Sequence, residues 1–204
     1  LEVFGSFEGV VQTKTELYRY LAQCNTEITE TLFTGETRFN PEVVPHFVFV
    51  NGDNQYLMPH VAECSLPSLS YGRPGRGYTI EGEVVECSPW LTLRWRAGEG
   101  AWHKVNTQLV GAYNIDNVLA AVLVGFCFKV PVHAIDHALQ HYVPHNNRSE
   151  YRRTEHNSLI IDAYNANLSS MQAAIESFRQ TTAERKMMIL GDMRELGEAS
   201  ADAH

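Results

Sequence analysis

Apolar residues recur three and four positions apart in three segments, the spacing of helices with one buried face. These segments lie at about residues 8–22, 115–126 and 135–142, and residues 171–178 also have a helical composition. The pattern therefore predicts four helices spread over the length of the chain.

Short apolar runs between these segments predict strands. Residues 47–50 read as a buried strand followed by the turn Asn51-Gly52, and residues 78–85, 90–96 and 101–109 read as three more strands. The last two flank a glycine-containing turn at residues 97–100, so we expect an antiparallel meander. Glycine and proline content predicts a loop over residues 69–77.

The pattern changes after residues 144–147. A buried strand at 159–161, the helix at 171–178 and a second buried strand at 186–190 follow within about 35 residues, which is the length of a βαβ unit with parallel strands. We therefore predict an α/β protein with a domain boundary near Asn147, so that residues 1–147 and 148–204 belong to different domains.

Composition narrows the class of protein. The 24 acidic and 16 basic residues give a net charge of −8, which argues against a nucleic-acid surface dominated by phosphate contacts. Four widely spaced cysteines form no C-x-x-C pair, so neither a zinc ribbon nor a disulfide framework is expected, and a reducing cytoplasm fits best. No apolar run approaches the roughly 20 residues of a membrane span, and no signal peptide opens the chain.

Lys14 has an unusual position, because it falls three or four residues from Val10, Val11, Leu17 and Tyr18. This spacing predicts that it lies within the apolar stripe of the first helix. A lysine there either extends its ammonium group to water or has a local reason to be buried.

Asn114 and Asn117 lie three residues apart at the start of a predicted helix. The N-cap role alone would be enough to explain Asn114. Alternatively, the two carboxamides recognise an adenine edge, since an amide matches a neighbouring donor and acceptor together.

Asp162 ends a predicted strand and precedes the polar run Tyr164-Asn165-Ala166-Asn167. Ligands bind beyond the carboxyl ends of strands in open α/β sheets, and a carboxylate there can accept hydrogen bonds from ribose hydroxyls. The alternative is an Asx turn with a helix cap at Ser169 or Ser170. Arg148, at the proposed boundary, is either solvated or a bidentate ligand for phosphate.

Two other patterns carry less weight. Four histidines recur every fourth residue from His133 to His145. The first three could share one helical face, but this face lies opposite the apolar stripe and lacks an H-E-x-x-H arrangement, so a solvated face is expected. The loop from Gly72 to Gly77 is not followed by G-K-S/T or by a helix. The whole chain contains no G-x-x-x-x-G-K-S/T phosphate loop.

In their order along the chain, these features resemble the Mur ligases. Residues 1–6 with Lys14-Thr15-Glu16-Leu17 are similar to the family segment H-L-E-x-F-G-S…K-x-E-L/I, and residues 111–121 to the adenine motif G-x-H/Y-N-x-x-N-x-L-A-A. Arg148-Ser149 matches the arginine that opens the family's C-terminal domain.

Two further segments resemble one branch of the family most closely, the ligases that add D-alanyl-D-alanine. Residues 162–171 are similar to D-x-Y-N-A-N-P-x-S-M, with Leu168 in place of the proline, and residues 190–197 to L-G-D-M-x-E-L-G. Tyr113 stands where a histidine is common elsewhere, so only Asn114 and Asn117 are carried over from the adenine motif.

The resemblance implies a fold and a reaction. The chain would comprise the later half of a central ATP-binding domain, with helices and the meander, and the first βαβ unit of a Rossmann-like C-terminal domain. The reaction would be ATP-driven amide formation: the carboxylate of UDP-MurNAc-tripeptide becomes an acyl phosphate, which the amine of D-Ala-D-Ala attacks, with Mg²⁺ neutralising charge on the transferring oxygens.

The resemblance also implies roles for the candidate residues. Lys14 would be carbamylated and would support Mg²⁺ through the new oxygens, because burial lowers a lysine's pKa and supplies the neutral amine. Asn114 and Asn117 would hold adenine, Asp162 the ribose and Arg148 the phosphates. Tyr164, Asn165 and Asn167 would shape the substrate cleft.

Other interpretations remain at this level. The family's phosphate loop would precede Leu1, so we expect a fragment that binds ATP weakly and is inactive alone. A different amide ligase of the same superfamily and a non-catalytic nucleotide-binding module are the alternatives. Oligomerisation is one way in which a truncated sheet would protect its edges.

Overall fold

The computed structural model describes residues 6–25, 46–145, 147–193, 196 and 200–203. The motif residues Leu1 to Gly5, Arg194, Glu195 and Gly197 lie outside the described residues, and so does Asn146 at the predicted boundary.

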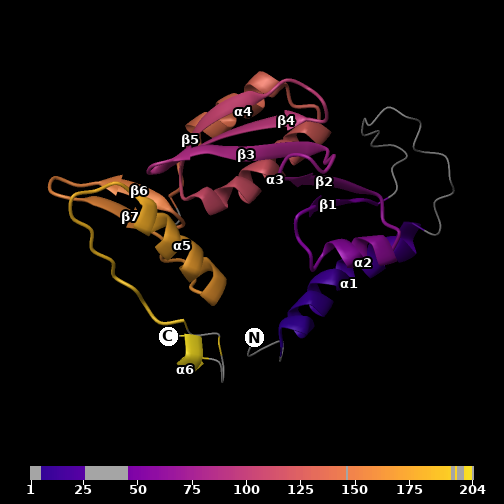
Figure 1. Cartoon of the computed structure of the whole chain (residues 1–204). Coiled ribbons are helices and arrows are strands. Elements are labelled where there is room, and N and C mark those ends of the chain that lie inside the picture. Colours follow the sequence, from indigo (N-terminus) through magenta and orange to yellow (C-terminus); the bar gives the residue numbers. More distant parts are fainter. Residues whose placement is uncertain (1–5, 26–45, 146, 194–195, 197–199, 204) are drawn as a thin grey trace.

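The described part of the chain contains helices and strands in a mixed order (Figure 1). In sequence order the elements are α1 (Phe7–Asn25), β1 (Val48–Asn51), α2 (Met58–Glu63), β2 (Ser68–Gly72), β3 (Ile80–Cys87), β4 (Trp90–Ala97), β5 (His103–Val110), the 3₁₀ turn η1 (Ala112–Asn114), α3 (Ile115–Cys127), α4 (Val132–His141), β6 (Glu150–Arg153), β7 (Ser158–Ile161), α5 (Leu168–Gln180) and α6 (Ser200–Ala203).

Strands β1 to β5 form one sheet in sequence order. β1, β2 and β3 are parallel neighbours, whereas β3, β4 and β5 form an antiparallel meander. The predicted meander is therefore confirmed. β2 and β3 pair over a short stretch, in which Tyr71 lies opposite Ile80 and Gly72 opposite Glu81.

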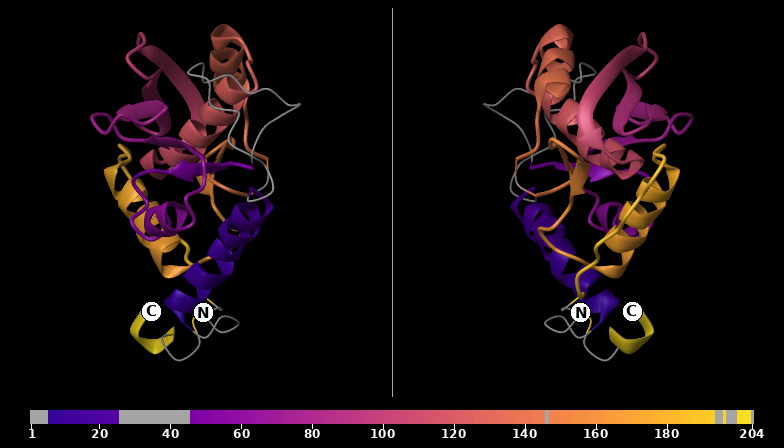
Figure 2. Two further views of the ribbon diagram at one scale, coloured as in Figure 1. Left: turned by 90° about the vertical axis from the view of Figure 1, so that its right-hand side faces the viewer. Right: turned by 90° about the vertical axis from the view of Figure 1, so that its left-hand side faces the viewer.

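Helices α3 and α4 cover one face of this sheet (Figure 2), and the main core lies between them and the strands. Strand positions alternate: the buried residues of β4 are Leu91, Leu93 and Trp95, while Arg94 lies exposed between them. Residues of α3 at helical spacing close the core from the other side, among them Val118 and Leu119. A second, smaller cluster joins α1, β1 and α2 around Tyr18 and Val50.

Strands β6 and β7 form a separate antiparallel pair, with Glu150 opposite Ile161. This pair contacts the larger sheet, since the rings of Trp90 and Tyr151 meet edge to face with centroids 5.1 Å apart. α5 follows β7 and descends beside it in Figure 1, so that α5 and α1 reach toward the same end of the molecule.

The structure corrects two predicted elements. The loop predicted over residues 69–77 is wrong in its first part, because residues 68–72 form β2 and only residues 73–77 are irregular. Pairing with β1 on one side and β3 on the other outweighs the weak strand propensity of a glycine- and serine-containing segment.

The strand predicted at residues 186–190 is also wrong, and with it the parallel βαβ pair. This segment is irregular, and Met187 and Ile189 are 79% and 85% exposed. A strand needs a hydrogen-bonded neighbour, and in the described part of the chain β7 pairs with β6 alone. The other predicted strands and the four helices are confirmed to within a few residues, although Tyr142 follows the end of α4 and is exposed.

Candidate functional site

Three segments distant in sequence meet at the hydroxyl of Tyr113. It lies 2.7 Å from the hydroxyl of Ser149 and donates to Asp162 Oδ2 at 3.2 Å. Tyr113 belongs to η1, directly before α3, whereas Ser149 precedes β6 and Asp162 follows β7. The adenine-like motif is thereby joined to the acidic residue predicted to bind ribose.

The environment of Tyr113 makes its hydroxyl a donor over a wide pH range. Burial, followed by the charge and hydrogen bond of Asp162, raises the pKa of Tyr113 to about 12, although the hydrogen bond with Ser149 acts in the opposite direction. The phenol therefore stays protonated at neutral pH and keeps its proton directed at the carboxylate.

Gly111 permits the turn that brings Tyr113 to this position. Its φ of +94° lies in a region that residues with a Cβ avoid. A Cβ on Gly111 would also lie 2.3 Å from Cε1 of the Tyr113 ring. The ring packs directly over the glycine backbone, which explains the glycine two positions before the tyrosine.

Asn114 and Asn117 are hydrogen-bonded to each other, as expected for two amides on one helix face. Asn117 Nδ2 donates to Asn114 Oδ1 at 3.1 Å, and Asn114 Nδ2 donates to the backbone oxygen of Val110 at 2.8 Å. Asn114 occupies the N-cap position of α3, but its side chain makes no capping hydrogen bond. Asn114 is buried and Asn117 is exposed, so Asn114 holds the exposed amide in place.

Arg148 stacks its guanidinium group on Tyr164, 3.6 Å from the ring centroid. Stacking uses the face of the guanidinium group and leaves its N–H donors in the plane free to bind an anion. The backbone keeps this pair beside Asp162, because Ala163 N donates to Asn147 O at 2.8 Å. Both side chains are exposed.

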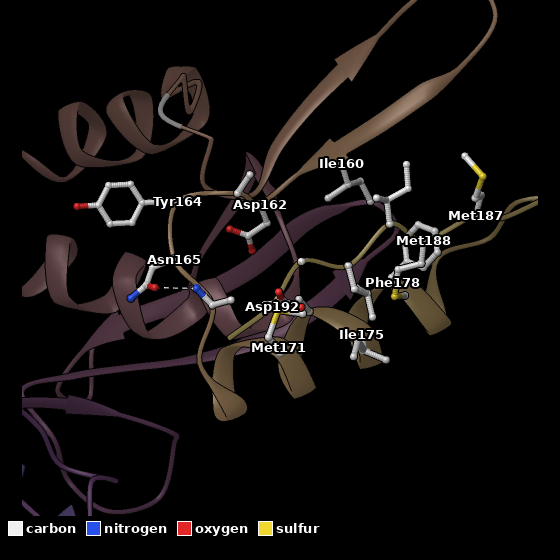
Figure 3. A pocket seen from close by; sticks show the side chains of 16 residues that line it. Ile160, Asp162, Tyr164, Asn165, Met171, Ile175, Phe178, Met187, Met188 and Asp192 are labelled. Carbon is white, nitrogen blue, oxygen red and sulfur yellow. Dashed lines mark hydrogen bonds between the residues drawn. The ribbon is translucent and has the colours of Figure 1, made fainter. Parts of the chain in front are cut away.

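A cavity of about 680 Å³ lies directly after β7, between α5 and the irregular segment that ends at Asp192. Figure 3 shows Asp162, Tyr164 and Asn165 at one end and the apolar side chains of Ile160, Ile175, Phe178, Met187 and Met188 at the other. The cavity therefore has polar groups at one end and apolar side chains at the other.

Asn167 has a structural role that differs from those of Tyr164 and Asn165. It is the N-cap of α5: its Oδ1 accepts from Ser170 N at 2.9 Å, and Ser170 Oγ accepts from Asn167 N in return. The cap predicted at Ser169 or Ser170 is thus wrong by two or three residues. Asn165 Oδ1 accepts from Ala166 N at 2.9 Å.

Lys14 does not lie in the apolar stripe of α1, so its predicted position within that stripe is wrong. The buried residues of this helix are Thr15 and Tyr18, and Lys14 is exposed, as is Leu17. The packed face is rotated by about one residue from the predicted one, because α1 buries Tyr18 against β1 and α2. The structure does not bring Lys14 into the cluster around Tyr113.

No group of three or more histidine, cysteine, aspartate or glutamate side chains suited to a metal ion occurs among the described residues. The described residues therefore do not form a ready-made site for Mg²⁺. Mg²⁺ commonly retains several waters and binds one or two carboxylates together with substrate phosphates.

The glycine-rich loop after β2 already holds a carboxylate of the chain itself. Glu81 Oε1 accepts hydrogen bonds from the backbone N–H groups of Gly75 and Gly77 at 3.0 Å and of Arg76 at 3.3 Å, and its other oxygen pairs with Arg96 at 2.7 Å. This occupied nest gives a physical reason why the loop is not a phosphate site.

Two residues of the site, Tyr113 and Ser149, were missed by the sequence reasoning. Tyr113 stands where a histidine is common in the family motif, and Ser149 follows Arg148 without a pattern of its own. The available signal was a hydrogen-bonding side chain inside the adenine-like motif. Only the tertiary structure reveals its partner.

Comparisons with known proteins show what the chain is similar to. Residues 147–204 match the family model "Mur ligase, glutamate ligase domain". A UDP-N-acetylmuramoyl-tripeptide–D-alanyl-D-alanine ligase of Treponema pallidum is 33% identical over 106 residues, 52% of this chain and 22% of that protein. The ligase of the same name from Haemophilus influenzae is 27% identical over 209 residues, covering 100% of this chain and 39% of that protein.

The chain is therefore similar to Mur ligases, most clearly over residues 147–204. The fold agrees: the MurF ligase of Thermotoga maritima, solved in complex with ADP, superimposes with a TM-score of 0.75 at 18% identity over 100% of this chain and 42% of that one. The chain thus spans about two fifths of the length of the MurF relatives that it matches throughout. Among the described residues, no helix combines the length and apolar character needed to cross a bilayer.

Proposed function

We propose that this chain is part of a MurF ligase, which uses ATP to join D-Ala-D-Ala to UDP-MurNAc-tripeptide. The observation that carries the proposal is the contact of Tyr113 with Asp162, because it unites the asparagine motif of one segment with the acidic and polar residues of another. The shared name of the Treponema and Haemophilus relatives supports the choice of this ligase within the family.

The ATP-binding roles follow from the contacts. Asn117, whose amide is exposed and oriented by Asn114, retains hydrogen-bonding capacity for the adenine edge. Asp162, at the end of β7, accepts hydrogen bonds from the ribose hydroxyls with the carboxylate that accepts one from Tyr113 in this structure. Arg148 binds phosphate through the in-plane N–H groups that its stacking on Tyr164 leaves available.

The reaction has two steps in this proposal. The terminal carboxylate of the tripeptide attacks the γ-phosphorus of ATP, which gives an acyl phosphate and ADP. The amine of D-Ala-D-Ala then attacks the acyl carbon, and inorganic phosphate leaves as the amide forms. Tyr164 and Asn165 contribute polar groups at one end of the cavity after β7, whereas Asn167 acts through the α5 cap that sets the direction of this segment.

Lys14 is proposed as the carbamylated lysine on the strength of its K-x-E-L segment alone. The side chain is exposed on α1 and not buried as the resemblance implies, and a carbamate there would supply oxygen ligands for Mg²⁺. The described residues add no further ligand cluster. Mg²⁺ would supply charge neutralisation at the phosphates.

The domain boundary near Asn147 is proposed on two supports. The family match begins at residue 147, and β6 and β7 form a sheet of their own immediately after it. We further propose that the protein acts in the cytoplasm on small-molecule substrates.

The proposal is tested with the protein that carries this chain. Phosphate release should require ATP, UDP-MurNAc-tripeptide and D-Ala-D-Ala together, and Asp162→Asn should raise the KM for ATP. Glu155→Gln, in the exposed turn between β6 and β7, is the matched control and should leave the KM unchanged. Equal or faster phosphate release with a single amino acid in place of D-Ala-D-Ala would assign the chain to another amide ligase.

A further inference from the structure

Helix α4 presents its histidines to solvent, as the sequence predicts. His133, His137 and His141 are all exposed and follow one another at four-residue intervals. The rings of His137 and His141 stack, with centroids 4.0 Å apart and planes inclined by 22°. Two imidazoles therefore lie side by side on one turn of a regular helix.

The hydrogen bonding of His141 defines which of its nitrogens is available. Its Nδ1 lies 2.8 Å from the backbone oxygen of His137. A carbonyl oxygen only accepts, so Nδ1 carries the proton, and in the neutral ring the lone pair resides on Nε2. A backbone carbonyl that fixes the tautomer and orientation of a histidine in this way is the usual outer-shell partner of a metal-binding imidazole.

We propose that His137 and His141 form a chelating site for a late first-row divalent ion, with Cu²⁺ preferred over Ni²⁺ and Zn²⁺. Metal–nitrogen bonds of about 2.0–2.1 Å put two neighbouring ligand nitrogens roughly 3 Å apart on one ion. The rings, stacked at 4.0 Å, are close enough for rotation of the His137 side chain to turn one of its nitrogens toward an ion held by Nε2 of His141, which keeps its hydrogen bond to the backbone.

The surroundings favour a partly hydrated ion. No third histidine, cysteine or carboxylate joins the pair in the described part of the chain, so water completes the coordination. An open site with two imidazoles does not impose a geometry, and affinity should follow the general order in which Cu²⁺ binds most tightly. The net charge of −8 adds a general attraction for cations.

The site is independent of the proposed ligase chemistry. Asp136, on the same helix, is directed toward the sheet instead: it accepts from Trp95 Nε1 at 2.9 Å and lies 3.6 Å from His103. α4 packs against β5, while the residues assigned to ATP lie around the start of α3 and the end of β7. The two sites can therefore be tested separately.

The test uses the chain without an affinity tag. Calorimetric titration with Cu²⁺ and Ni²⁺ should give one ion per chain, and both ions should raise the melting midpoint. His137→Gln and His141→Gln should each weaken binding by about tenfold or more, because loss of one arm removes the chelate. His156→Gln removes one exposed imidazole elsewhere and should leave the affinity unchanged.

Melting curves without metal show whether each variant is folded. Both substituted positions are exposed, so the midpoints should match that of the parent chain. Should a single variant melt early, the metal affinity of the parent is compared instead with that of the doubly substituted His137→Asn/His141→Asn chain. Equal affinities of the parent and His137→Gln chains, or an equal loss in His156→Gln, would overturn the proposal.

Discussion

The hydroxyl of Tyr113 donates a hydrogen bond of 3.2 Å to Asp162, 49 positions further along the chain. One partner lies directly before α3 and the other directly after β7, so this bond links the parts of the chain that carry the β1–β5 sheet and the β6–β7 pair. It keeps the carboxylate beside the asparagine motif. A ribose hydroxyl that binds Asp162 would compete with the phenol for the same oxygen.

Replacing Tyr113 with phenylalanine should alter the alkaline stability of the chain. Because the folded pKa of about 12 exceeds the ordinary value of 10, the stabilisation is complete below pH 10 and is lost as the pH rises toward 12. After allowance for partial exposure, this loss should amount to about 1–2 kcal/mol.

Melting midpoints of the parent and Tyr113→Phe chains between pH 9 and pH 12 measure this difference. The parent should lose more stability across that range. Tyr20→Phe, which changes a tyrosine that is 62% exposed, serves as the control and should parallel the parent. Parallel curves for the parent and Tyr113→Phe would contradict the raised pKa.

Gly111→Ala should destabilise the fold by more than about 2 kcal/mol, since it combines an unfavourable φ with a clash against the Tyr113 ring. Gly98→Ala is the matched control, because Gly98 also has a positive φ but a Cβ there meets nothing within 4 Å. Urea unfolding of both variants separates the cost of the backbone from the cost of the contact. Equal losses would mean that the tyrosine ring moves aside freely.

Glu81→Gln should cost about 2–3 kcal/mol at neutral pH, because it leaves Arg96 beside a neutral amide and weakens the bonds from the loop. Burial tends to raise the pKa of Glu81, but the hydrogen bonds from Arg96 and from the backbone of Gly77 and Gly75 outweigh it and hold the pKa below 4.5. The lowered pKa makes this stabilisation present at neutral pH and lost in acid.

The difference between the parent and Glu81→Gln chains should therefore shrink as the pH falls below 4.5. Glu83→Gln, which affects the more exposed pair with Arg94, should cost less than about 1 kcal/mol. Chemical denaturation at pH 7 and pH 3.5 distinguishes the two. An undiminished difference in acid would show that the charge of Glu81 is not what stabilises the loop.

Lys14→Ala should leave the stability of the chain within about 0.5 kcal/mol of the parent, because the side chain is exposed. In the protein that carries this chain, the same change should lower ligase turnover by a factor of about 100 or more if the carbamate supports the transferring phosphoryl group. Lys104→Ala, at an exposed position on β5, is the control. Labelling with ¹³C-bicarbonate tests the modification directly, and normal turnover in Lys14→Ala would refute the role.

The local pattern of apolar and polar residues was sufficient to predict most helices and strands. It was insufficient to predict most contacts between them. The meander and helices α1, α3, α4 and α5 were predictable because each has a regular apolar repeat or a turn at its boundary. β2 was missed because its pairing with β1 and β3 is not encoded in its own residues. The strand predicted at 186–190 had the right composition but does not pair with β7.

The candidate site divides in the same way. The sequence identified Asn114, Asn117, Arg148 and Asp162 by type and order, and the structure adds the hydrogen bond between the two amides and the stacking of Arg148 on Tyr164. It could not identify Tyr113, whose importance depends on partners 36 and 49 residues away. Lys14 was misjudged because a helix with several apolar residues leaves the direction of its buried face uncertain by one position.

The apolar periodicities, the turns and the order of the polar motifs can be read from the chain without coordinates, because they depend on neighbours within a few residues. Tertiary structure alone decided which face of α1 is buried, which carboxylate fills the glycine-rich loop and which phenol meets Asp162. Each of these depends on packing between distant segments. The free energy of that packing arises when the two surfaces meet, so neither segment determines it alone.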